Sequence, residues 1–270
     1  MDICVIMVNY NNSKLSCDCC ISLLDQQREN NLDIIIVDNN SKKEEKDLLN
    51  QFVRNYNNVK SLFLNDNIGY FPAMEKGQRL AYSTGINYDY MIVANNDLIY
   101  ENDFLIELKK LGLKPDVMVV SPDIVRMDGV HQNPHFINPI SPMRKFLYHF
   151  FYSNWYVALI MTSILRFFNA KRRDKDKPCF DKAQYIYMGF GACYILTQKY
   201  MQEVKFLDTR SFLMGEEQLL TIQIKKHGGK IYYTPNLKVH HMDSATFKQK
   251  PNRFAYECER KSYKLYKDFI

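Results

Sequence analysis

The sequence predicts an α/β protein with a Rossmann-like, mostly parallel central sheet and helices on both faces. In residues 1–125, short apolar runs typical of buried strands alternate with segments that have helical periodicity. Each apolar run is followed by Asn, Asp or Ser. Because alternating strands and helices build parallel βαβ units, these polar residues should gather at one edge of the sheet. Open α/β sheets bind ligands at that edge.

The individual elements follow from this alternation. Apolar runs predict strands at residues 3–8, 33–38, 59–64, 88–93 and 117–120, the last closed by Ser121 and Pro122. Helices are expected between them at residues 13–28, 42–56, 72–82 and 103–111. The polar strand ends indicate a nucleotide-type cleft. No GxGxxG follows the first strand and the sequence contains no GxxxxGK[ST], so a dinucleotide-binding or P-loop protein is poorly supported.

An aromatic segment divides the chain. Residues 146–168 are apolar and rich in Phe and Tyr, and a basic run follows at residues 171–177. The length would allow a membrane span, but His149, Ser153, Asn154 and Arg166 interrupt the segment. Two interpretations stay open, namely a helix lying in the plane of a membrane with a basic flank, or an ordinary helix hairpin in the core or in a dimer.

The last third of the chain returns to mixed structure. Strand is expected at residues 182–197, interrupted by the small-residue segment Gly189-Phe190-Gly191-Ala192. A helix should begin near residue 212 and end at Gly228. Residues 231–233 and 237–239 look like two strands, and the tail at residues 252–270 like an amphipathic helix.

Composition places the chain among folded proteins. It has 270 residues, of which 46% are hydrophobic and 24% charged, with a net charge of +6. The chain carries a net positive charge, but its sequence contains no motif that reads a groove of a nucleic acid, so nucleic-acid binding is weakly supported. The seven cysteines are an odd number without paired CxxC spacing, which favours reduced thiols. Residues 1–8 are too short for a signal segment, so we expect the catalytic part in the cytoplasm.

The triplet Asn95-Asn96-Asp97 ends the strand at residues 88–93. Its oxygen donors suit a hard cation such as Mg²⁺ or Mn²⁺ that bridges phosphates. Taken alone, the triplet is explained as well by a strand-ending turn, which Asn and Asp favour.

Five motifs occur in a meaningful order. They are Val8-Asn9-Tyr10-Asn11, Val37-Asp38-Asn39-Asn40-Ser41, Asn67-Ile68-Gly69-Tyr70, Asn95-Asn96-Asp97, and Gly215-Glu216-Glu217 with Val239-His240. In this order the chain resembles the family 2 glycosyltransferases of GT-A fold, in particular the rhamnosyltransferase-like branch that builds bacterial surface polysaccharides such as capsule and O-antigen. The resemblance covers residues 3–247 and leaves out the insertion at residues 146–177.

The resemblance implies a donor site at the strand ends. The loops after the first two strands would hold the base and ribose through Asn9, Tyr10, Asn11, Asp38 and Asn40. Asn67, Gly69 and Tyr70 would also line the pocket of the nucleotide sugar, together with Asn95 and Asn96.

It also implies a metal site and a catalytic base. Asn95-Asn96-Asp97 matches the DxD-type metal motif in a degenerate NxD form, with Asp97 as the main ligand and Asn95 in place of the first carboxylate. His240 matches the histidine that completes this site, with His241 as its competitor. Gly189, Phe190 and Gly191 match the acceptor-side segment. Glu217 stands where the family has its catalytic base, and Glu216 is the immediate rival.

The resemblance therefore implies an inverting, Mg²⁺- or Mn²⁺-dependent transfer of a hexosyl or deoxyhexosyl group from a UDP-, GDP- or dTDP-sugar. The acceptor would be a saccharide, lipid-linked, at the inner face of the plasma membrane. The domain would span residues 1–247, with a nucleotide-sugar-binding half at 1–125, a helical insertion at 140–180 and an acceptor half at 181–247. Residues 248–270 would form a C-terminal helix. The alternative is a non-catalytic nucleotide-sugar-binding or scaffold protein, since Asn95 and Glu217 both depart from the family pattern.

Overall fold

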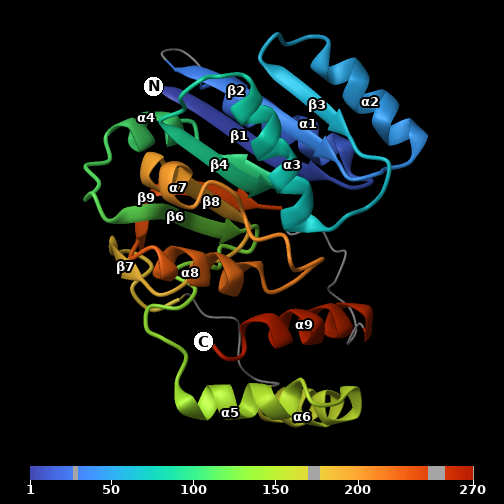
Figure 1. The fold of residues 1–270 in the computed structure, drawn as a ribbon, viewed down its shortest axis with the longest axis vertical. Helices are drawn as coiled ribbons and strands as arrows, with labels where there is room; N and C mark the ends of the chain where they lie inside the picture. The colour runs from blue at the N-terminus through green and yellow to red at the C-terminus, as the bar shows by residue number, and fades with distance from the viewer. Residues whose placement is uncertain (27–29, 170–176, 243–252, 270) are drawn as a thin grey trace.

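A mixed nine-stranded sheet forms the centre of the molecule. The computed structural model describes residues 1–26, 30–169, 177–242 and 253–269, with the sheet order β3-β2-β1-β4-β8-β6-β9-β5 and β7 paired to β9 (Figure 1). The strands are β1 (Asp2–Asn9), β2 (Asn31–Asp38), β3 (Val59–Phe63), β4 (Tyr90–Asn95), β5 (Leu98–Tyr100), β6 (Val117–Arg126), β7 (Gln184–Ile186), β8 (Cys193–Thr197) and β9 (Lys230–His241). The helices are α1 (Ser13–Leu24), α2 (Lys43–Val53), α3 (Tyr70–Ser83), α4 (Phe104–Lys109), α5 (Pro142–Phe151), α6 (Trp155–Asn169), α7 (Gln198–Glu203), α8 (Glu216–Lys226) and α9 (Arg253–Tyr266).

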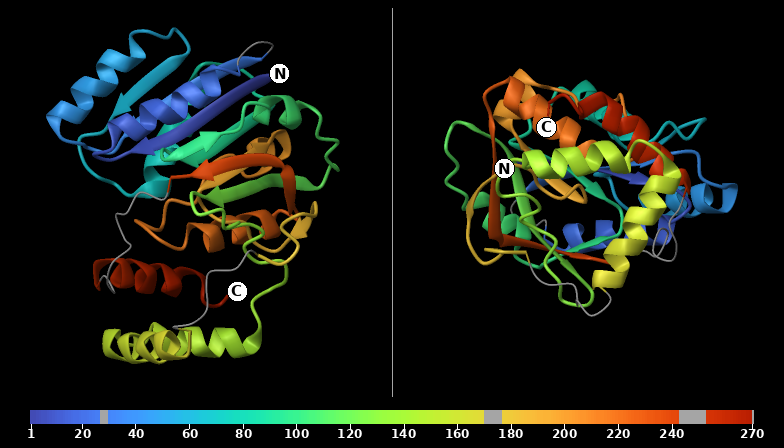
Figure 2. Two further views of the ribbon diagram at one scale, coloured as in Figure 1. Left: turned by 180° about the vertical axis from the view of Figure 1, so that it is seen from behind. Right: turned by 90° about the horizontal axis from the view of Figure 1, so that it is seen from below.

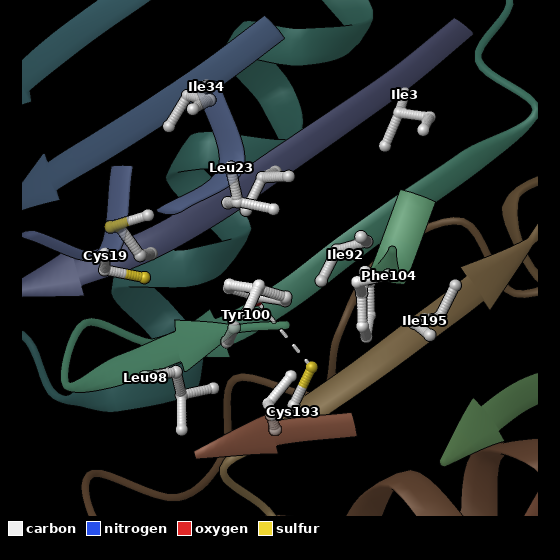
Figure 3. Close-up of a cluster of buried hydrophobic side chains, with 14 of the residues drawn as sticks. Ile3, Cys19, Leu23, Ile34, Ile92, Leu98, Tyr100, Phe104, Cys193 and Ile195 are labelled. Atoms are coloured by element: carbon white, nitrogen blue, oxygen red, sulfur yellow. Dashed lines mark hydrogen bonds between the residues drawn. The ribbon is translucent and has the colours of Figure 1, made fainter. Parts of the chain in front are cut away.

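Helices cover both faces of the sheet, as predicted. Along β1, Ile3 packs in one buried cluster and Cys4 in another, because successive side chains of a strand point to opposite faces. The cluster around Ile3 includes Leu23 of α1 and Phe104 of α4 (Figure 3). The opposite cluster takes side chains from α3, α7 and α8. The α/β prediction is confirmed, although α7 was not expected. All seven cysteines are free thiols, and only Cys179 is exposed.

The second half of the sheet departs from a simple βα alternation. Strand β8 lies antiparallel between β4 and β6, and β5 and β7 both run antiparallel to β9. The expected pair of strands near residues 231–239 is one strand, β9, with an irregularity opposite Pro122 and Asp123. Pro235 and Asn236 look like a strand break in the sequence, but here they occupy that irregularity.

Strand β6 continues through Ser121 and Pro122, where the sequence predicted its end. Proline lacks the N–H that a central strand needs. It is tolerated because the pairing with β8 covers only Val119 and Val120, and the register with β9 shifts directly after Pro122.

Three helices form a layer at one end of the molecule. The aromatic segment forms two helices, α5 and α6, which residues 152–154 separate, as the hairpin interpretation expected and the single in-plane helix did not (Figures 1 and 2). Helix α9, predicted from the tail, lies between this pair and the rest of the fold, with the Tyr256 hydroxyl donating to the Phe151 carbonyl at 3.0 Å. Among the described residues, none of the helices combines the length and the apolar character needed to cross a bilayer. The basic run at residues 171–177 lies almost wholly outside the described residues.

Candidate active site

Three parallel strands end at the same edge of the sheet. The register pairs Asn9 at the end of β1 with Asp38 at the end of β2, and Val8 with Asn95 at the end of β4. The loops that follow these strands therefore lie side by side, where ligands bind in open α/β sheets.

Asn9 and Asp38 form a buried network between the first two strand ends. The Asn9 amide donates to Asp38 Oδ2 at 2.9 Å, and the Ser41 N–H donates to Asp38 Oδ1 at 3.0 Å. Neither Asn9 nor Asp38 has any exposed surface. The expectation that these two residues contact the base and ribose is corrected here, because their polar atoms already hold the two loops together.

The neighbours of this network face outward. Tyr10 is 49% exposed, and Asn40 is exposed as well. Asn11 is partly exposed, and its N–H donates to Ser41 Oγ at 2.8 Å. Of the residues predicted for the base and ribose, Tyr10, Asn11 and Asn40 are therefore the accessible ones.

The turn at residues 67–70 is held from two sides. The Asn39 amide donates to Asn67 Oδ1 at 2.8 Å and to the Gly69 carbonyl at 3.0 Å. Gly69 has a φ of +98°, and a Cβ there would lie 2.2 Å from the Phe212 carbonyl oxygen, so only glycine fits. The Tyr70 N–H donates to the same oxygen at 2.8 Å. This turn therefore joins the donor side of the site to the loop before α8.

Asp97 and His241 face each other. Asp97 Oδ1 lies 3.3 Å from His241 Nε2, and both side chains are 8% exposed. His241 Nδ1 lies 2.8 Å from Gln132 Oε1. Because an amide oxygen only accepts, Nδ1 donates this hydrogen bond, and Nε2 is the ring nitrogen that faces the carboxylate. A divalent cation at this position could take Nε2 and the carboxylate as ligands.

His240 lies on the other side of β9, with its Nε2 3.1 Å from Glu101 Oε1. The register with β5 places His241 opposite Leu98 and His240 opposite Ile99. Since successive side chains of a strand alternate, His240 does not reach Asp97. The histidine beside Asp97 is His241, which corrects the predicted role of His240.

Asn95 and Asn96, which precede Asp97, form hydrogen bonds with neighbouring side chains and so fix the metal side of the site, the part around Asp97 and His241. The Tyr70 hydroxyl donates to Asn95 Oδ1, and the Asn96 amide donates to Ser16 Oγ at 2.8 Å. No cluster of three carboxylate, imidazole or thiol side chains that could hold a metal occurs within the described ranges. Asp97 and His241 fit a cation that takes its other ligands from a diphosphate and water, which is how Mg²⁺ is commonly bound.

The first turn of α8 holds two glutamates with few partners. Glu216 is 6% exposed, and its Oε1 has no hydrogen-bond partner in the described part of the chain. Burial, and then the charge of Glu217, raise the pKa of Glu216 to about 8. Burial also raises the pKa of Glu217, while a hydrogen bond from the Gly191 N–H at 3.3 Å favours its ionised form. Glu217, whose ionised form receives the Gly191 hydrogen bond, is the better candidate for a base.

Tyr70 connects the two sides. Burial, followed by the charges of Glu216 and Asp97, raises the pKa of Tyr70 well above its usual value. The Tyr70 hydroxyl bonds Asn95 and its N–H bonds the Phe212 carbonyl, so this residue joins the metal side to the loop that precedes the acid pair.

The acceptor-side segment borders this site. Gly189 is buried, and a Cβ there would lie 2.5 Å from Ser121 Oγ. Phe190 lines a cavity of about 200 Å³, and its ring centroid lies 6.2 Å from that of His241. The next residue, Gly191, contacts Glu217. One residue of this segment therefore lines the cavity, and the next residue contacts Glu217 of the acid pair.

Two residues of the site had no signal in the sequence. Gln132 orients His241, and Glu259 of α9 accepts a hydrogen bond from the Tyr152 hydroxyl at 3.4 Å. Burial, and the charge of Glu217, raise the pKa of Glu259. Both residues lie outside any motif, and only contacts between distant segments bring them to the site.

Three solved structures share this fold. They are S. aureus TarS 1-349 (13% identity, TM-score 0.59, covering 89% of this chain and 60% of that one), GalNAc-T7 with UDP, GalNAc and Mn²⁺ (14%, 0.55, 89% and 44%) and mannosyltransferase PcManGT from Pyrobaculum calidifontis with GDP-Man and Mn²⁺ (13%, 0.57, 97% and 69%). At these identities the likeness concerns the fold alone, and it defines the class as GT-A. The chain spans less than two thirds of the length of the TarS structure.

A family model described as glycosyl transferase family 2 matches residues 4–173, which is more than half of the chain. The chain therefore belongs to glycosyl transferase family 2. The match extends into the helical insertion that the sequence resemblance left out. No curated protein matches the chain.

Proposed function

We propose that the chain transfers one sugar from a nucleoside diphosphate donor to a saccharide acceptor, with inversion at the anomeric carbon. The observation that carries this proposal is that Tyr70 joins the two sides of the site, because its hydroxyl donates to Asn95 of the metal motif and its N–H donates to the Phe212 carbonyl in the loop before α8. Sugar transfer needs charge stabilisation on a departing diphosphate and a base for the attacking hydroxyl. The site offers a group for each task.

In the proposed reaction, an acceptor hydroxyl oxygen attacks C1 of the donor sugar on the face opposite the diphosphate. The new C1–O bond forms while the bond from C1 to the diphosphate oxygen breaks, and its electron pair leaves with the diphosphate. The hydroxyl proton passes to Glu217. A single base opposite the leaving group gives inversion through an oxocarbenium-like transition state. Glu217 is preferred to Glu216 because the Gly191 N–H stabilises its ionised form.

Asp97 and His241 would hold the Mg²⁺ or Mn²⁺ ion, which acts as a Lewis acid on the departing diphosphate when bound. Asn95 accepts the Tyr70 hydrogen bond, which favours a positioning role for it over direct ligation. The presence of Mn²⁺ in two of the similar structures supports a divalent cation here.

We assign the donor's base and ribose to the accessible residues Tyr10, Asn11 and Asn40. The donor would be a UDP-, GDP- or dTDP-sugar with a hexosyl or deoxyhexosyl group. UDP and GDP-Man in two similar structures support this class. The rhamnosyltransferase-like branch, and a place in capsule or O-antigen synthesis, rest on the sequence resemblance.

The test is release of nucleoside diphosphate from a panel of UDP-, GDP- and dTDP-sugars, with Mn²⁺, Mg²⁺ or EDTA and with candidate saccharide acceptors. We expect metal-dependent release that Glu217→Gln lowers by about 10²- to 10⁴-fold. Glu216→Gln is the matched control and should retain most of the activity. Tight donor binding without release, in the presence of an acceptor that a related enzyme uses, would favour the non-catalytic alternative.

We further propose that the acceptor is lipid-linked and that the enzyme lies peripherally at the inner face of the plasma membrane. Helix α5 has no buried residue, and both α5 and α6 turn large apolar side chains to solvent. The exposed side chains are Met143, Phe146, Leu147, Phe150, Tyr156, Ile160, Ile164 and Leu165. Residues 142–169 contain Arg and Lys but no Asp or Glu. An apolar face without acidic residues suits an anionic lipid surface better than a second copy of the same face.

Liposome sedimentation tests this contact. The double variant Phe146→Ser, Ile160→Ser should lose most binding to vesicles that contain phosphatidylglycerol. Leu48→Ser is the control, since Leu48 is also exposed but lies on α2. Equal partitioning of all three proteins would rule the contact out, as would a change in oligomeric state of the double variant without a change in partitioning.

A further inference from the structure

The proposed reaction assigns no role to the cavity beside His241. It is lined by Arg126, Val130, His131, Gln132, His135, Lys177 and Phe190. At about 200 Å³ it is smaller than the 300–1,000 Å³ or so of a complete ligand site, and suits one small charged group with part of a sugar.

Positive charge concentrates around this cavity. Burial, then the charges of Lys177 and Arg144, lower the pKa of His135 to about 4, so this histidine stays neutral and adds no charge. Arg144 stacks on the Phe136 ring with its guanidinium carbon 4.9 Å from the centroid. Within the described ranges, no carboxylate lies at ion-pair distance from either Lys177 or Arg144. Of the two, Lys177 lines the cavity and is therefore available to an incoming anion there.

The other charged groups of the lining are engaged locally. The Arg126 guanidinium lies 2.7 Å from Asp128, and His131 Nδ1 lies 2.8 Å from Asp123 Oδ1. Lys177 is thus the lining residue whose charge is least compensated, and it stands out as the residue to test.

The position of the cavity relates it to the acceptor. Phe190 lines the cavity, and the N–H of the next residue, Gly191, bonds Glu217. Consecutive Cα atoms lie about 3.8 Å apart, so the cavity wall at Phe190 adjoins the segment that contacts Glu217. Gln132 lines the same cavity and also binds His241. This wall of the cavity therefore lies next to the pair formed by Asp97 and His241.

We propose that this cavity binds a phosphate group carried by the acceptor, with the attached sugar lying on Phe190 and presenting its hydroxyl to Glu217. A phosphate, with its double charge and several acceptor oxygens, matches the cationic Lys177 in the lining better than a neutral sugar does. This inference rests on the proposed transfer reaction and narrows its acceptor to a sugar phosphate or phosphodiester. The same chemistry could come from the donor's diphosphate, and the test separates the two sources.

The test measures binding in the absence of turnover. Ligand-observed NMR gives the affinity for glucose 1-phosphate, with methyl glucoside as the uncharged probe, and calorimetry gives the affinity for UDP and GDP with Mn²⁺. The proteins are the wild type, Lys177→Ala, and Lys182→Ala as a control that removes the same charge from an exposed lysine nearby.

We expect Lys177→Ala to weaken glucose 1-phosphate binding by about tenfold or more, as for the loss of a charge-assisted contact. Methyl glucoside and nucleoside diphosphate affinities should stay within about twofold, and Lys182→Ala should resemble the wild type. Equal glucose 1-phosphate affinity in all three proteins, or no binding by the wild type, would overturn the inference. A matching loss of nucleoside diphosphate affinity in Lys177→Ala would assign the cavity to the donor. Because no turnover is measured, failure of the transfer reaction would not produce these results.

Discussion

On the donor side of the site, buried polar side chains bind one another, whereas on the acceptor side one buried and one partly buried carboxylate have few partners. Asn9 and Asp38 have complementary groups within 3 Å and no exposed surface. Glu216 leaves one oxygen without a partner in the described residues, and Glu217 receives one hydrogen bond of 3.3 Å from a backbone N–H.

The difference distinguishes residues that hold the loops in place from residues that could take part in the reaction. Satisfied polar groups hold loops in place and gain little by changing protonation. Carboxylates that are buried with few donors bind protons tightly, which is the property that a general base near neutral pH requires. Substitutions on the donor side should therefore cost stability, and those on the acceptor side should cost activity.

The largest effect is expected for Asp38→Ala. The change leaves the Asn9 amide and the Ser41 N–H without their acceptor in a fully buried position. The free energy of unfolding, measured with urea, should fall by about 2–4 kcal/mol. Asp66→Ala, at an exposed aspartate on the loop after β3, is the control and should change it by less than about 0.5 kcal/mol. If Asp38→Ala lost activity but kept its full stability, the contrast between the two sides of the site would be wrong.

Gly191→Ala should affect activity more than stability. The added Cβ would lie 2.8 Å from Glu217 Oε1 and would push the carboxylate away. A displacement near 1 Å costs about a hundredfold in rate, which nucleoside diphosphate release would report. In the control Gly112→Ala the new methyl group meets open space. Unchanged turnover in Gly191→Ala would argue against Glu217 as the base.

Gln132→Leu tests the orientation of His241. Without the amide oxygen, the ring loses the hydrogen bond that keeps the proton on Nδ1. Mn²⁺ affinity, measured by electron paramagnetic resonance in the presence of nucleoside diphosphate, should fall by about 10- to 100-fold. Asn138→Leu, at an exposed position of the same loop, serves as the control. Equal Mn²⁺ affinity of both variants would remove Gln132 from the site.

Glu216 also makes the stability of the protein depend on pH. Its pKa rises from 4.5 to about 8 on folding, so between these values the native state holds a proton that the unfolded state has lost. The contribution is complete below pH 4.5 and shrinks by up to about 1.4 kcal/mol per unit as pH rises toward 8. Glu216→Gln should flatten this slope and should gain stability relative to the wild type at pH 8 compared with pH 5. Parallel curves for the two proteins would show that Glu216 is not protonated in the native state.

Much of the donor side could be predicted from local patterns. The strand that ends at Asn9 and the one that ends at Asp38 are visible as apolar runs followed by polar residues, because a buried strand must stop where its side chains become polar. The turn with Gly69 was also predicted. The role of Asp38 was not, since the same strand-end aspartate can face a ligand or bind a neighbouring loop.

By itself the sequence determined the α/β class, the edge of the sheet where the site lies and the acid pair at the start of α8. These follow from periodicity and residue type, which act over a few neighbouring positions. Only the tertiary structure decided that His241 rather than His240 meets Asp97, that Gln132 orients it, and that Lys177 borders the cavity lined by Phe190. Those outcomes depend on the register of β9 against β5 and on contacts between segments far apart in the chain, which no local pattern encodes.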